Sequence, residues 1–133
     1  MILCDSSAII ALINRHDQNH LRCVAALKHI NSQLITTWAC LTEAMYFLGV
    51  KAGVQGQEIL RGYLEDGLIT LHIGSNEEAT RIYFLMRQYT YMDFADASLV
   101  AMAEVLDTYR VFTLDSHFYS YLANNKTPFE VLP

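Results

Sequence analysis

YMDFADASLVAMA, the stretch formed by residues 91–103, places two acids at the head of an almost wholly apolar segment. After Asp93 and Asp96 no further charge appears until Glu104. A helix this apolar must be largely buried, so its first turn is the part expected to reach a surface or cleft. Capping is the alternative role for both acids, because Asp is a favoured N-cap and acids near a helix N-terminus are stabilising.

Length and composition favour one folded unit. The 133 residues are 53% hydrophobic and 17% charged, which argues against disorder, so we expect residues 1–133 to form a single domain. No apolar run is long enough to span a bilayer, and no basic segment opens the chain. The three cysteines show no CxxC spacing and are expected to be buried, reduced thiols in a cytoplasmic protein.

The net charge of −5 would ordinarily argue against a nucleic-acid substrate, because such a protein must meet phosphates. Five of the 14 acids are expected to share one site, and setting them aside leaves the remaining acids equal in number to the 9 basic residues. Bound divalent cations would offset much of the remaining charge. The acidic balance therefore does not exclude a nucleic-acid substrate.

Short apolar runs alternate with helical patterns along the chain, which predicts an α/β fold with a parallel sheet and helices on both faces. Asp17 is a candidate N-cap of the second helix, and Gly53 is expected to end the third. The expected strands are residues 1–4, 34–36, 68–73, 111–114 and 129–132. The expected helices are residues 6–14, 20–30, 38–51, 54–65, 75–87 and 93–106, with a short helical segment from residue 116.

Acids occupy special places in this pattern. Asp5 and Asp115 each follow an apolar strand, and parallel strands carry their carboxyl ends to one edge of the sheet, where α/β proteins bind ligands. Glu43 is the only charged residue between Lys28 and Lys51, and a lone carboxylate among core residues is costly unless it is paired or bound to a metal. We therefore expect these acids to meet Asp93 and Asp96 in a common cleft.

Carboxylates gathered in one cleft repel one another unless they share a proton or bind a cation. Oxygen ligands suit Mg²⁺ or Mn²⁺, and no cluster of histidines or cysteines points to zinc. Such a site can lower the pKa of bound water and stabilise in-line attack on a phosphate. The pattern thus favours metal-assisted hydrolysis of phosphodiester bonds.

At this point the chain resembles the PIN-domain ribonucleases, of the kind found as toxins in bacterial type II toxin–antitoxin pairs of the virulence-associated protein C type. The resemblance runs end to end, and the segments that carry it are CDSS (4–7), LTE (41–43), DASLVA (96–101) and FTLDSHF (112–118). It implies a PIN-like three-layer α/β/α fold, an endoribonuclease, a homodimer and an antitoxin that occludes the cleft. The RNA substrate would be tRNA or another structured RNA.

The resemblance also implies that four acids hold Mg²⁺ or Mn²⁺: Asp5, Glu43, Asp96 and Asp115. Asp93 matches an additional acid of some members, with helix capping as its first role and contact with metal or water as its second. Hydroxyl groups near the metal are expected from Ser6, Ser7 and Thr113, for which the alternative is a local cap or turn hydrogen bond.

Other polar and aromatic residues have weaker signals. His117 is expected as a surface turn residue, although contact with a substrate phosphate is the alternative. Four basic residues are candidates for contact with an RNA backbone, but scattered surface charge is the simpler interpretation of each. They are Arg15, Arg22, Lys28 and Arg81. We expect Tyr83, Tyr89 and Tyr91 to lie in the core, and base stacking is the alternative role.

Two rival functions remain at this level. A receiver-like phosphoacceptor domain also places acids and Mg²⁺ at a sheet edge, but it requires paired acids near the first strand and a lysine on a late strand. Here Asp5 stands alone, and the late strand ends Thr113-Leu114-Asp115. A non-catalytic PIN-like module that binds RNA or protein is the second rival.

Overall fold

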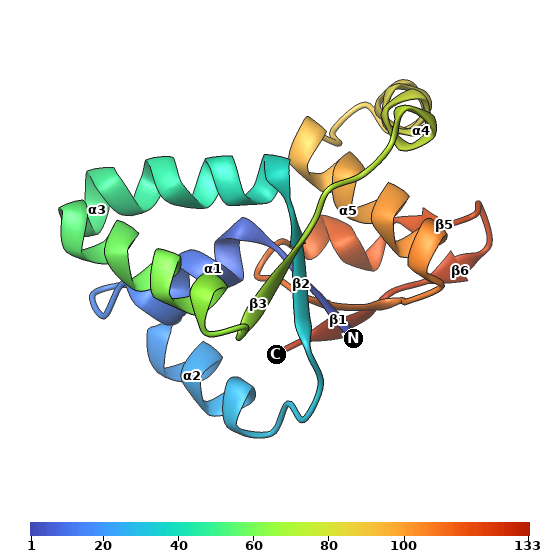
Figure 1. Ribbon diagram of the computed structural model, residues 1–133. Helices are drawn as coiled ribbons and strands as arrows, with labels where there is room; N and C mark the ends of the chain where they lie inside the picture. Colours follow the sequence, from blue (N-terminus) through green and yellow to red (C-terminus); the bar gives the residue numbers. More distant parts are fainter.

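Five parallel strands form the centre of the computed structural model, which describes residues 1–133 (Figure 1). All four pairings between neighbours are parallel, and β1 lies in the middle. In spatial order the strands are β3 (Ile69–His72), β2 (Leu34–Thr37), β1 (Ile2–Cys4), β4 (Arg110–Phe112) and β7 (Glu130–Leu132). The predicted α/β fold with a parallel sheet is confirmed, and all five strands end at the same edge.

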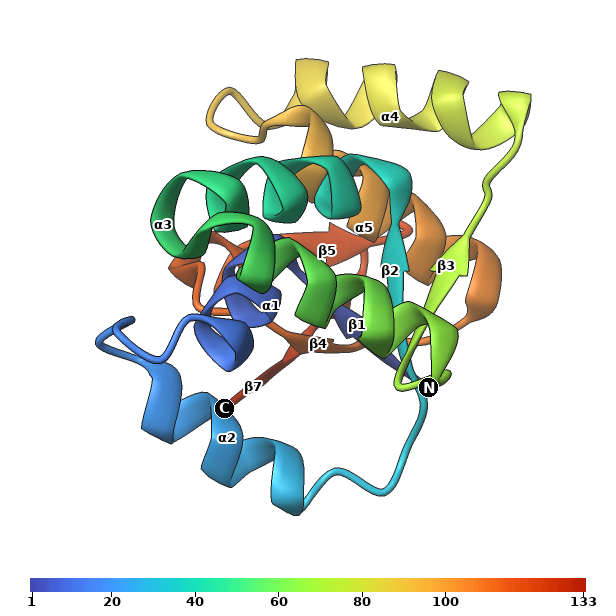
Figure 2. The same cartoon turned by 60° about the vertical axis from the view of Figure 1, so that its left-hand side comes forward.

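Helices cover both faces of this sheet (Figures 1 and 2). One face carries α1 (Ser6–Ile13), α2 (His20–Lys28) and α3 (Trp38–Glu65), and the other carries α5 (Phe94–Leu106). Side chains of a strand alternate between the two layers, as the period of two requires. Ile2 and Cys4 join the core under α1 and α3, whereas Leu3 joins the core under α5. The sheet thus separates two hydrophobic cores.

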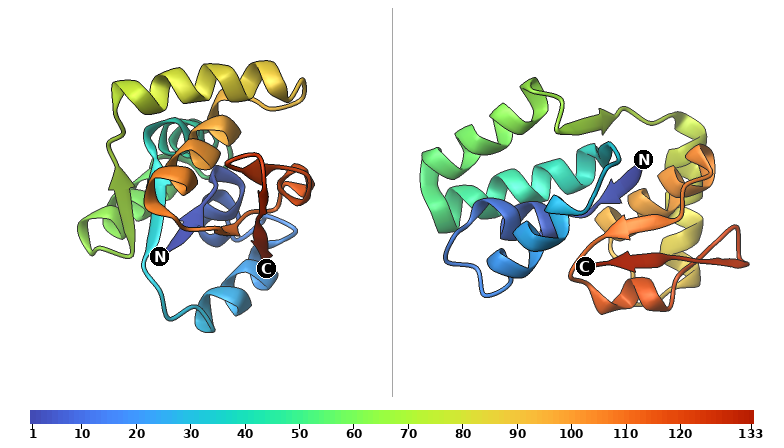
Figure 3. Two further views of the ribbon diagram at one scale, coloured as in Figure 1. Left: turned by 90° about the vertical axis from the view of Figure 1, so that its right-hand side faces the viewer. Right: turned by 90° about the horizontal axis from the view of Figure 1, so that it is seen from below.

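Helix α4 (Asn76–Gln88) forms an outer layer over α5 (Figure 3). Its Ile82 and Leu85 join the core of α5, and Arg81 donates two hydrogen bonds to Glu104 on α5. Ser75 caps α4 by accepting a hydrogen bond from the backbone of Glu78. Helix α4 therefore packs mainly on α5 and contacts the sheet only at its β3 edge, where Glu78 lies 2.7 Å from His72.

Helix α3 is bent back on itself at Gly53, whose φ of 66° and ψ of −162° lie outside the helical region. A side chain with a Cβ is strained at such a positive φ, which is why glycine stands here. The two halves pack antiparallel, and Gln57 Nε2 in the second half donates a hydrogen bond of 3.1 Å to the Met45 carbonyl oxygen in the first. The predicted helix end at Gly53, with a second helix from residue 54, is confirmed.

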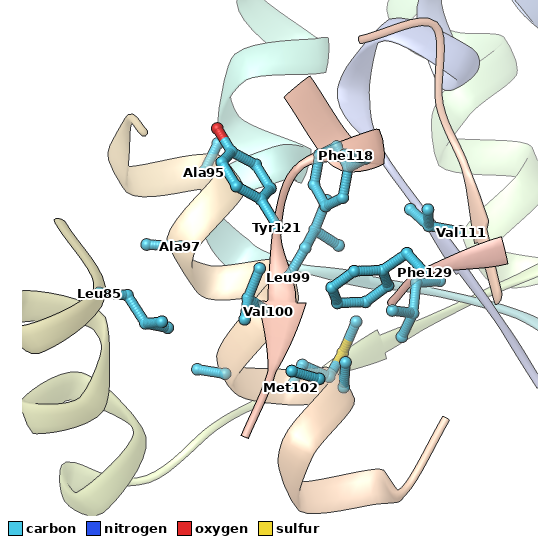
Figure 4. Close-up of a cluster of buried hydrophobic side chains, with 14 of the residues drawn as sticks. Leu85, Ala95, Ala97, Leu99, Val100, Met102, Val111, Phe118, Tyr121 and Phe129 are labelled. Carbon is cyan, nitrogen blue, oxygen red and sulfur yellow. The ribbon is translucent and has the colours of Figure 1, made fainter. Parts of the chain in front are cut away.

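The C-terminal segment contains elements that the sequence pattern does not predict. After the 3₁₀ helix η1 (Ser116–Tyr119), β5 (Leu122–Ala123) and β6 (Thr127–Pro128) form a two-stranded antiparallel ribbon. Its turn holds Asn124 and Asn125 at positive φ. Figure 4 shows Phe118, Tyr121 and Phe129 from this region packed around α5.

The start of α2 differs from expectation. Asn19, not Asp17, occupies the N-cap position, and its side chain makes no capping hydrogen bond. Asp17 instead accepts a hydrogen bond of 2.8 Å from the Asn19 backbone and so shapes the turn before the helix. No helix in the structure combines the length and the apolar character needed to cross a membrane.

Candidate metal centre at the carboxyl edge of the sheet

Neighbouring strands bring the predicted acids to one edge of the sheet. Asp5 follows β1 and caps α1, and its backbone N–H donates a hydrogen bond of 3.0 Å to the Phe112 carbonyl oxygen at the end of β4. Asp115 follows β4 three residues later and caps η1. Asp96 enters from the first turn of α5, and Glu43 from the second turn of α3.

Asp5 is the most completely hydrogen-bonded of these acids. Its Oδ1 accepts from the Ser6 backbone at 2.8 Å, and its Oδ2 accepts from Ser7 Oγ at 2.8 Å and Thr113 Oγ1 at 2.7 Å. Asp5 is 4% exposed, so burial raises its pKa, while the three donors lower it and the charge of Asp115 raises it further. The Asp5 pKa is raised overall, because the donors offset only part of the effect of burial.

Glu43 reaches the site through a serine. Ser6, the first residue of α1, donates its hydroxyl hydrogen bond to Glu43 Oε1 across the interface between α1 and α3. Glu43 Oε2 accepts no hydrogen bond from the chain. Ser6 thereby holds one oxygen of Glu43 near Asp5 and leaves the other oxygen available to a ligand.

Asp96 is held by a phenol that the sequence pattern does not identify. The Tyr121 hydroxyl donates a hydrogen bond of 2.8 Å to Asp96 Oδ2, and Figure 4 shows this hydroxyl directed at the first turn of α5. Burial raises the pKa of Asp96 to about 8; the Tyr121 hydrogen bond opposes the rise, and the charges of three neighbouring acids add to it. These neighbours are Asp93, Asp5 and Asp115.

Asp115 and His117 complete the group. His117 Nδ1 lies 3.2 Å from Asp115 Oδ1, and the His117 backbone N–H donates to the same oxygen at 2.9 Å. Three residues each offer one ligand atom, and these atoms lie within 4.8 Å of one another, close enough to hold one metal ion. The residues are Asp96, Asp115 and His117. His117 is half exposed, as expected of a surface residue, but its contact with Asp115 was not expected.

The secondary candidates fall into two groups. Ser6, Ser7 and Thr113 each donate a side-chain hydrogen bond to a carboxylate of the site, so they position the acids rather than only close local turns. Asp93 is exposed and caps α5 by accepting a hydrogen bond of 2.8 Å from the Asp96 backbone, which is the first role predicted for it.

The basic residues divide by their surroundings. Arg81 is engaged by Glu104 and faces α5, so it is not free to contact RNA. Lys51, which the sequence pattern does not single out, lines a hollow beside Ser6, Ser7 and Glu43. A neighbouring hollow is lined by Lys51, Arg15 and His16. Basic groups therefore continue along the surface from one side of the acidic site.

Comparisons with known proteins agree with this architecture. The model of the family described as the PIN domain matches residues 2–122. None of the curated proteins compared matches the sequence significantly.

Three solved structures share the fold over the whole chain. The VapC20 toxin of Mycobacterium tuberculosis, described as cleaving the sarcin-ricin loop, is 15% identical with a TM-score of 0.85, and 100% of each chain is covered. A toxin–antitoxin complex from Klebsiella pneumoniae is 16% identical with a TM-score of 0.73, covering 100% of this chain and 97% of that one. FitAcB from Neisseria gonorrhoeae is 22% identical with a TM-score of 0.65 and the same coverage. At these identities the likeness shows the fold alone.

Proposed function

The chain belongs to the PIN-domain family, whose model matches residues 2–122, and we propose that it is a Mg²⁺- or Mn²⁺-dependent endoribonuclease, the toxin of a toxin–antitoxin pair. One observation carries the proposal: four carboxylates from four separate segments meet at the sheet edge, and no lysine or arginine forms an ion pair with any of them. Two of the four, Asp5 and Asp96, are buried. Burying unpaired carboxylates is costly, and a cation bound from solution would remove that cost.

The donor set fits a hard divalent cation. It consists of carboxylate oxygens with hydroxyls behind them and one imidazole at the margin, which suits Mg²⁺ or Mn²⁺ better than zinc. The residues that would hold the ion are Asp5, Glu43, Asp96 and Asp115. When bound, such an ion supplies charge neutralisation at the scissile phosphate and a lowered pKa of water.

The protein's own contribution is to orient the acids before any ligand arrives. In three of them one oxygen is fixed by a donor: Ser6 holds Glu43, Tyr121 holds Asp96, and the His117 backbone holds Asp115. The second oxygen of each accepts no hydrogen bond within the chain. The arrangement therefore presents three free carboxylate oxygens around Asp5, whose two oxygens are held by hydrogen bonds, and this reduces the reorganisation required during the reaction.

An RNA strand is the substrate that this surface suits. Lys51 lies beside Glu43 and Arg15 lines the next hollow, so both would contact phosphates on one side of the scissile bond. VapC20, which shares the fold, is described as cleaving the sarcin-ricin loop, a structured RNA. We therefore assign the chain a structured RNA, with the cut at a phosphate that reaches the four acids.

Two protein partners are part of the proposal. The first is an antitoxin that places a basic side chain among the acids, since an arginine pairs strongly with carboxylates. Of the similar structures, one is described as a toxin and another as a toxin–antitoxin complex. The second is another copy of this chain. Trp38, Tyr46 and Phe94 are about half exposed or more around an apolar hollow beside Glu43, which would be covered in a dimer. The cytoplasm is the proposed location, where the three buried thiols stay reduced.

Cleavage of a pool of tRNA and structured RNA tests the proposal. The purified chain would be assayed with Mn²⁺, with Mg²⁺ and with EDTA, and Asp96→Asn prepared in the same way controls for contaminating nucleases. We expect metal-dependent cuts by the wild type that EDTA and the substitution both remove. Equal cleavage by Asp96→Asn, or cleavage in EDTA, would contradict the mechanism, and failure of the folded wild type to bind Mn²⁺ would favour a non-catalytic binding module.

A further inference from the structure

Two exposed aromatic rings stand directly beside the acidic site. Tyr91 is 48% exposed, and the side chain of His117 is 50% exposed. Their ring centroids lie 4.8 Å apart, with the planes tilted by 42°. Through their neighbours both rings are tied to the acids, because His117 contacts Asp115 and Tyr91 stacks on Tyr121, whose hydroxyl binds Asp96.

The rings beneath this pair fix its position. Tyr121 is completely buried, lies parallel to Tyr91 within 13° at a centroid distance of 5.8 Å, and makes edge contacts with Tyr89 and Phe118. Tyr91 and His117 are therefore the outermost members of a stack whose inner members belong to the core. A ring held in place by such a base loses little conformational freedom when a ligand binds to it.

We propose that Tyr91 and His117 form a stacking platform for one unpaired nucleobase of the substrate, next to the phosphate that is cut. The proposal rests on the proposed ribonuclease function and names its substrate class more closely. His117 touches Asp115, so a base on the platform lies within one nucleotide of a phosphate at the acids. Bases are uncharged, so the nearby carboxylates do not repel them as they repel phosphates.

The platform selects against paired RNA. In an A-form duplex each base is covered on both sides by its neighbours, and aromatic side chains stack on bases in loops, bulges and ends instead. Stacking on a side chain depends on a π face that every base has, so the platform tolerates different bases. We expect the cut at an unpaired nucleotide, with weak preference for base identity at that position.

Kinetics on matched RNAs test the proposal. A hairpin with one cleaved loop position would be compared with the same hairpin lacking the base at the nucleotide next to the cut. For the wild type, we expect loss of the base to raise KM about tenfold with kcat little changed. Tyr91→Leu should raise KM by a similar factor on the intact hairpin and add nothing on the abasic one, whereas Tyr91→Phe, which keeps the ring, should behave like the wild type.

Tyr83 offers a matched control, because it is 64% exposed on α4, outside the acidic group. Tyr83→Leu should cleave both hairpins as the wild type does. A Tyr91→Leu penalty of equal size on the intact and abasic hairpins would overturn the platform, because a merely structural role predicts it. Cleavage of a fully paired duplex as fast as the loop would overturn it as well.

A binding measurement separates this proposal from the nuclease proposal. In the Asp5→Asn background, a loop containing 2-aminopurine at the same position should lose fluorescence on binding, and the added Tyr91→Leu substitution should remove most of that quenching. If the wild type proves inactive while Tyr91-dependent quenching persists, the nuclease proposal fails and the platform stands. If quenching does not depend on Tyr91, the platform is wrong, and the exposed rings would be assigned to contact with a protein partner.

Discussion

Buried carboxylates occur in two regions of the molecule, and their surroundings differ. At the interface of α4 and α5, Glu104 accepts two hydrogen bonds from Arg81 at 2.8 and 2.9 Å and a third from the Asn124 backbone. In the same layer, Glu78 is 7% exposed and lies 2.7 Å from His72 Nε2. At the sheet edge, Asp5 and Asp96 are 4% and 5% exposed, but neither has a basic partner in the chain.

The pKa values follow this difference. Burial raises the pKa of Glu104, but the hydrogen bonds from Arg81 and Asn124 and the charge of Arg81 outweigh it, so the result is a lowered value. For Asp5 and Asp96 burial dominates and the neighbouring acids reinforce it, so both pKa values are raised. In the first region each of these carboxylates has a basic partner within the chain. In the second region Asp5 and Asp96 have none, and a cation bound from solution would supply it. Carboxylates with a partner stabilise the fold, and those without one are the candidates for function.

The largest expected effect is loss of RNA cleavage on neutralising the acids at the sheet edge. Asp96→Asn and Asp115→Asn should each lower kcat/KM about a thousandfold, because each removes a carboxylate from the proposed metal site while keeping its volume. Glu104→Gln is the matched control from the other region and should keep activity within about threefold. If Glu104→Gln impairs cleavage per folded molecule as much as Asp96→Asn does, the proposed functional difference between the two regions is wrong.

For stability, the large effect is expected in the other region, at the interface of α4 and α5. Arg81→Leu should lower the free energy of unfolding by about 2 kcal/mol, because it leaves the Glu104 carboxylate, 11% exposed, without its partner. Chemical denaturation would measure this, with RNA cleavage per folded molecule unchanged. Arg61→Leu is the control, since Arg61 pairs with Glu58 and Glu65 on the exposed surface and its loss should not measurably change stability. If Arg81→Leu and Arg61→Leu lose the same free energy of unfolding, then burial adds nothing to the contribution of the Arg81–Glu104 ion pair.

Stability should also depend on pH in opposite senses in the two regions. Without metal, folded Asp96 keeps its proton up to a pKa of about 8, whereas an ordinary Asp loses it near 3.8, so the free energy of unfolding falls as pH rises between these values. Asp96→Asn should flatten this fall; a pKa change of one corresponds to about 1.4 kcal/mol. Glu104, with a lowered pKa, contributes stability that is lost only on acidification below its ordinary range. Denaturation from pH 4 to 8 would reveal an unchanged slope in Asp96→Asn if the assignment to Asp96 is wrong.

The smallest expected effect concerns Lys51, the cation nearest to the hollow beside Glu43. It makes no ion pair with any acid, so it is not the missing partner of the sheet edge. Lys51→Gln should weaken RNA binding a few-fold and reduce the slope of log affinity against log salt by about 0.7, without changing stability. Lys28→Gln, at the end of α2, serves as control. Identical salt slopes for both variants and the wild type would remove Lys51 from the RNA path.

Most of the fold follows from local sequence patterns, because the strands and helices are short periodic segments between clear caps. The Asn-containing ribbon of β5 and β6 was not predicted, since two-residue strands carry no periodicity. The prediction from aromatic spacing was also wrong for two tyrosines. Tyr83 and Tyr91 were expected in the core but are exposed. Such surface positions depend on how α4 and the loop after it pack, which no local pattern records.

The candidate site was predictable where residues follow a strand or begin a helix. Asp5, Glu43, Asp96 and Asp115 lie together at one edge, as expected, although their role in catalysis stays a prediction. Tyr121 was missed because its partner Asp96 lies 25 residues earlier in the chain, and a tyrosine beside apolar residues looks like core. Its hydroxyl is visible only once α5 and the C-terminal segment are packed.

Mn²⁺ binding measured by calorimetry at pH 7, in two buffers of different ionisation enthalpy, tests the central claim most directly. The wild type should bind Mn²⁺ with release of protons, because Asp96 with a pKa of about 8 is protonated before the ion arrives. Glu104→Gln should bind as the wild type does, and Asp96→Asn at least about tenfold more weakly, as expected for loss of a ligand. Absence of Mn²⁺ binding by the folded wild type, or equal affinity in Asp96→Asn, would contradict the claim that these acids lack a partner that a metal ion supplies.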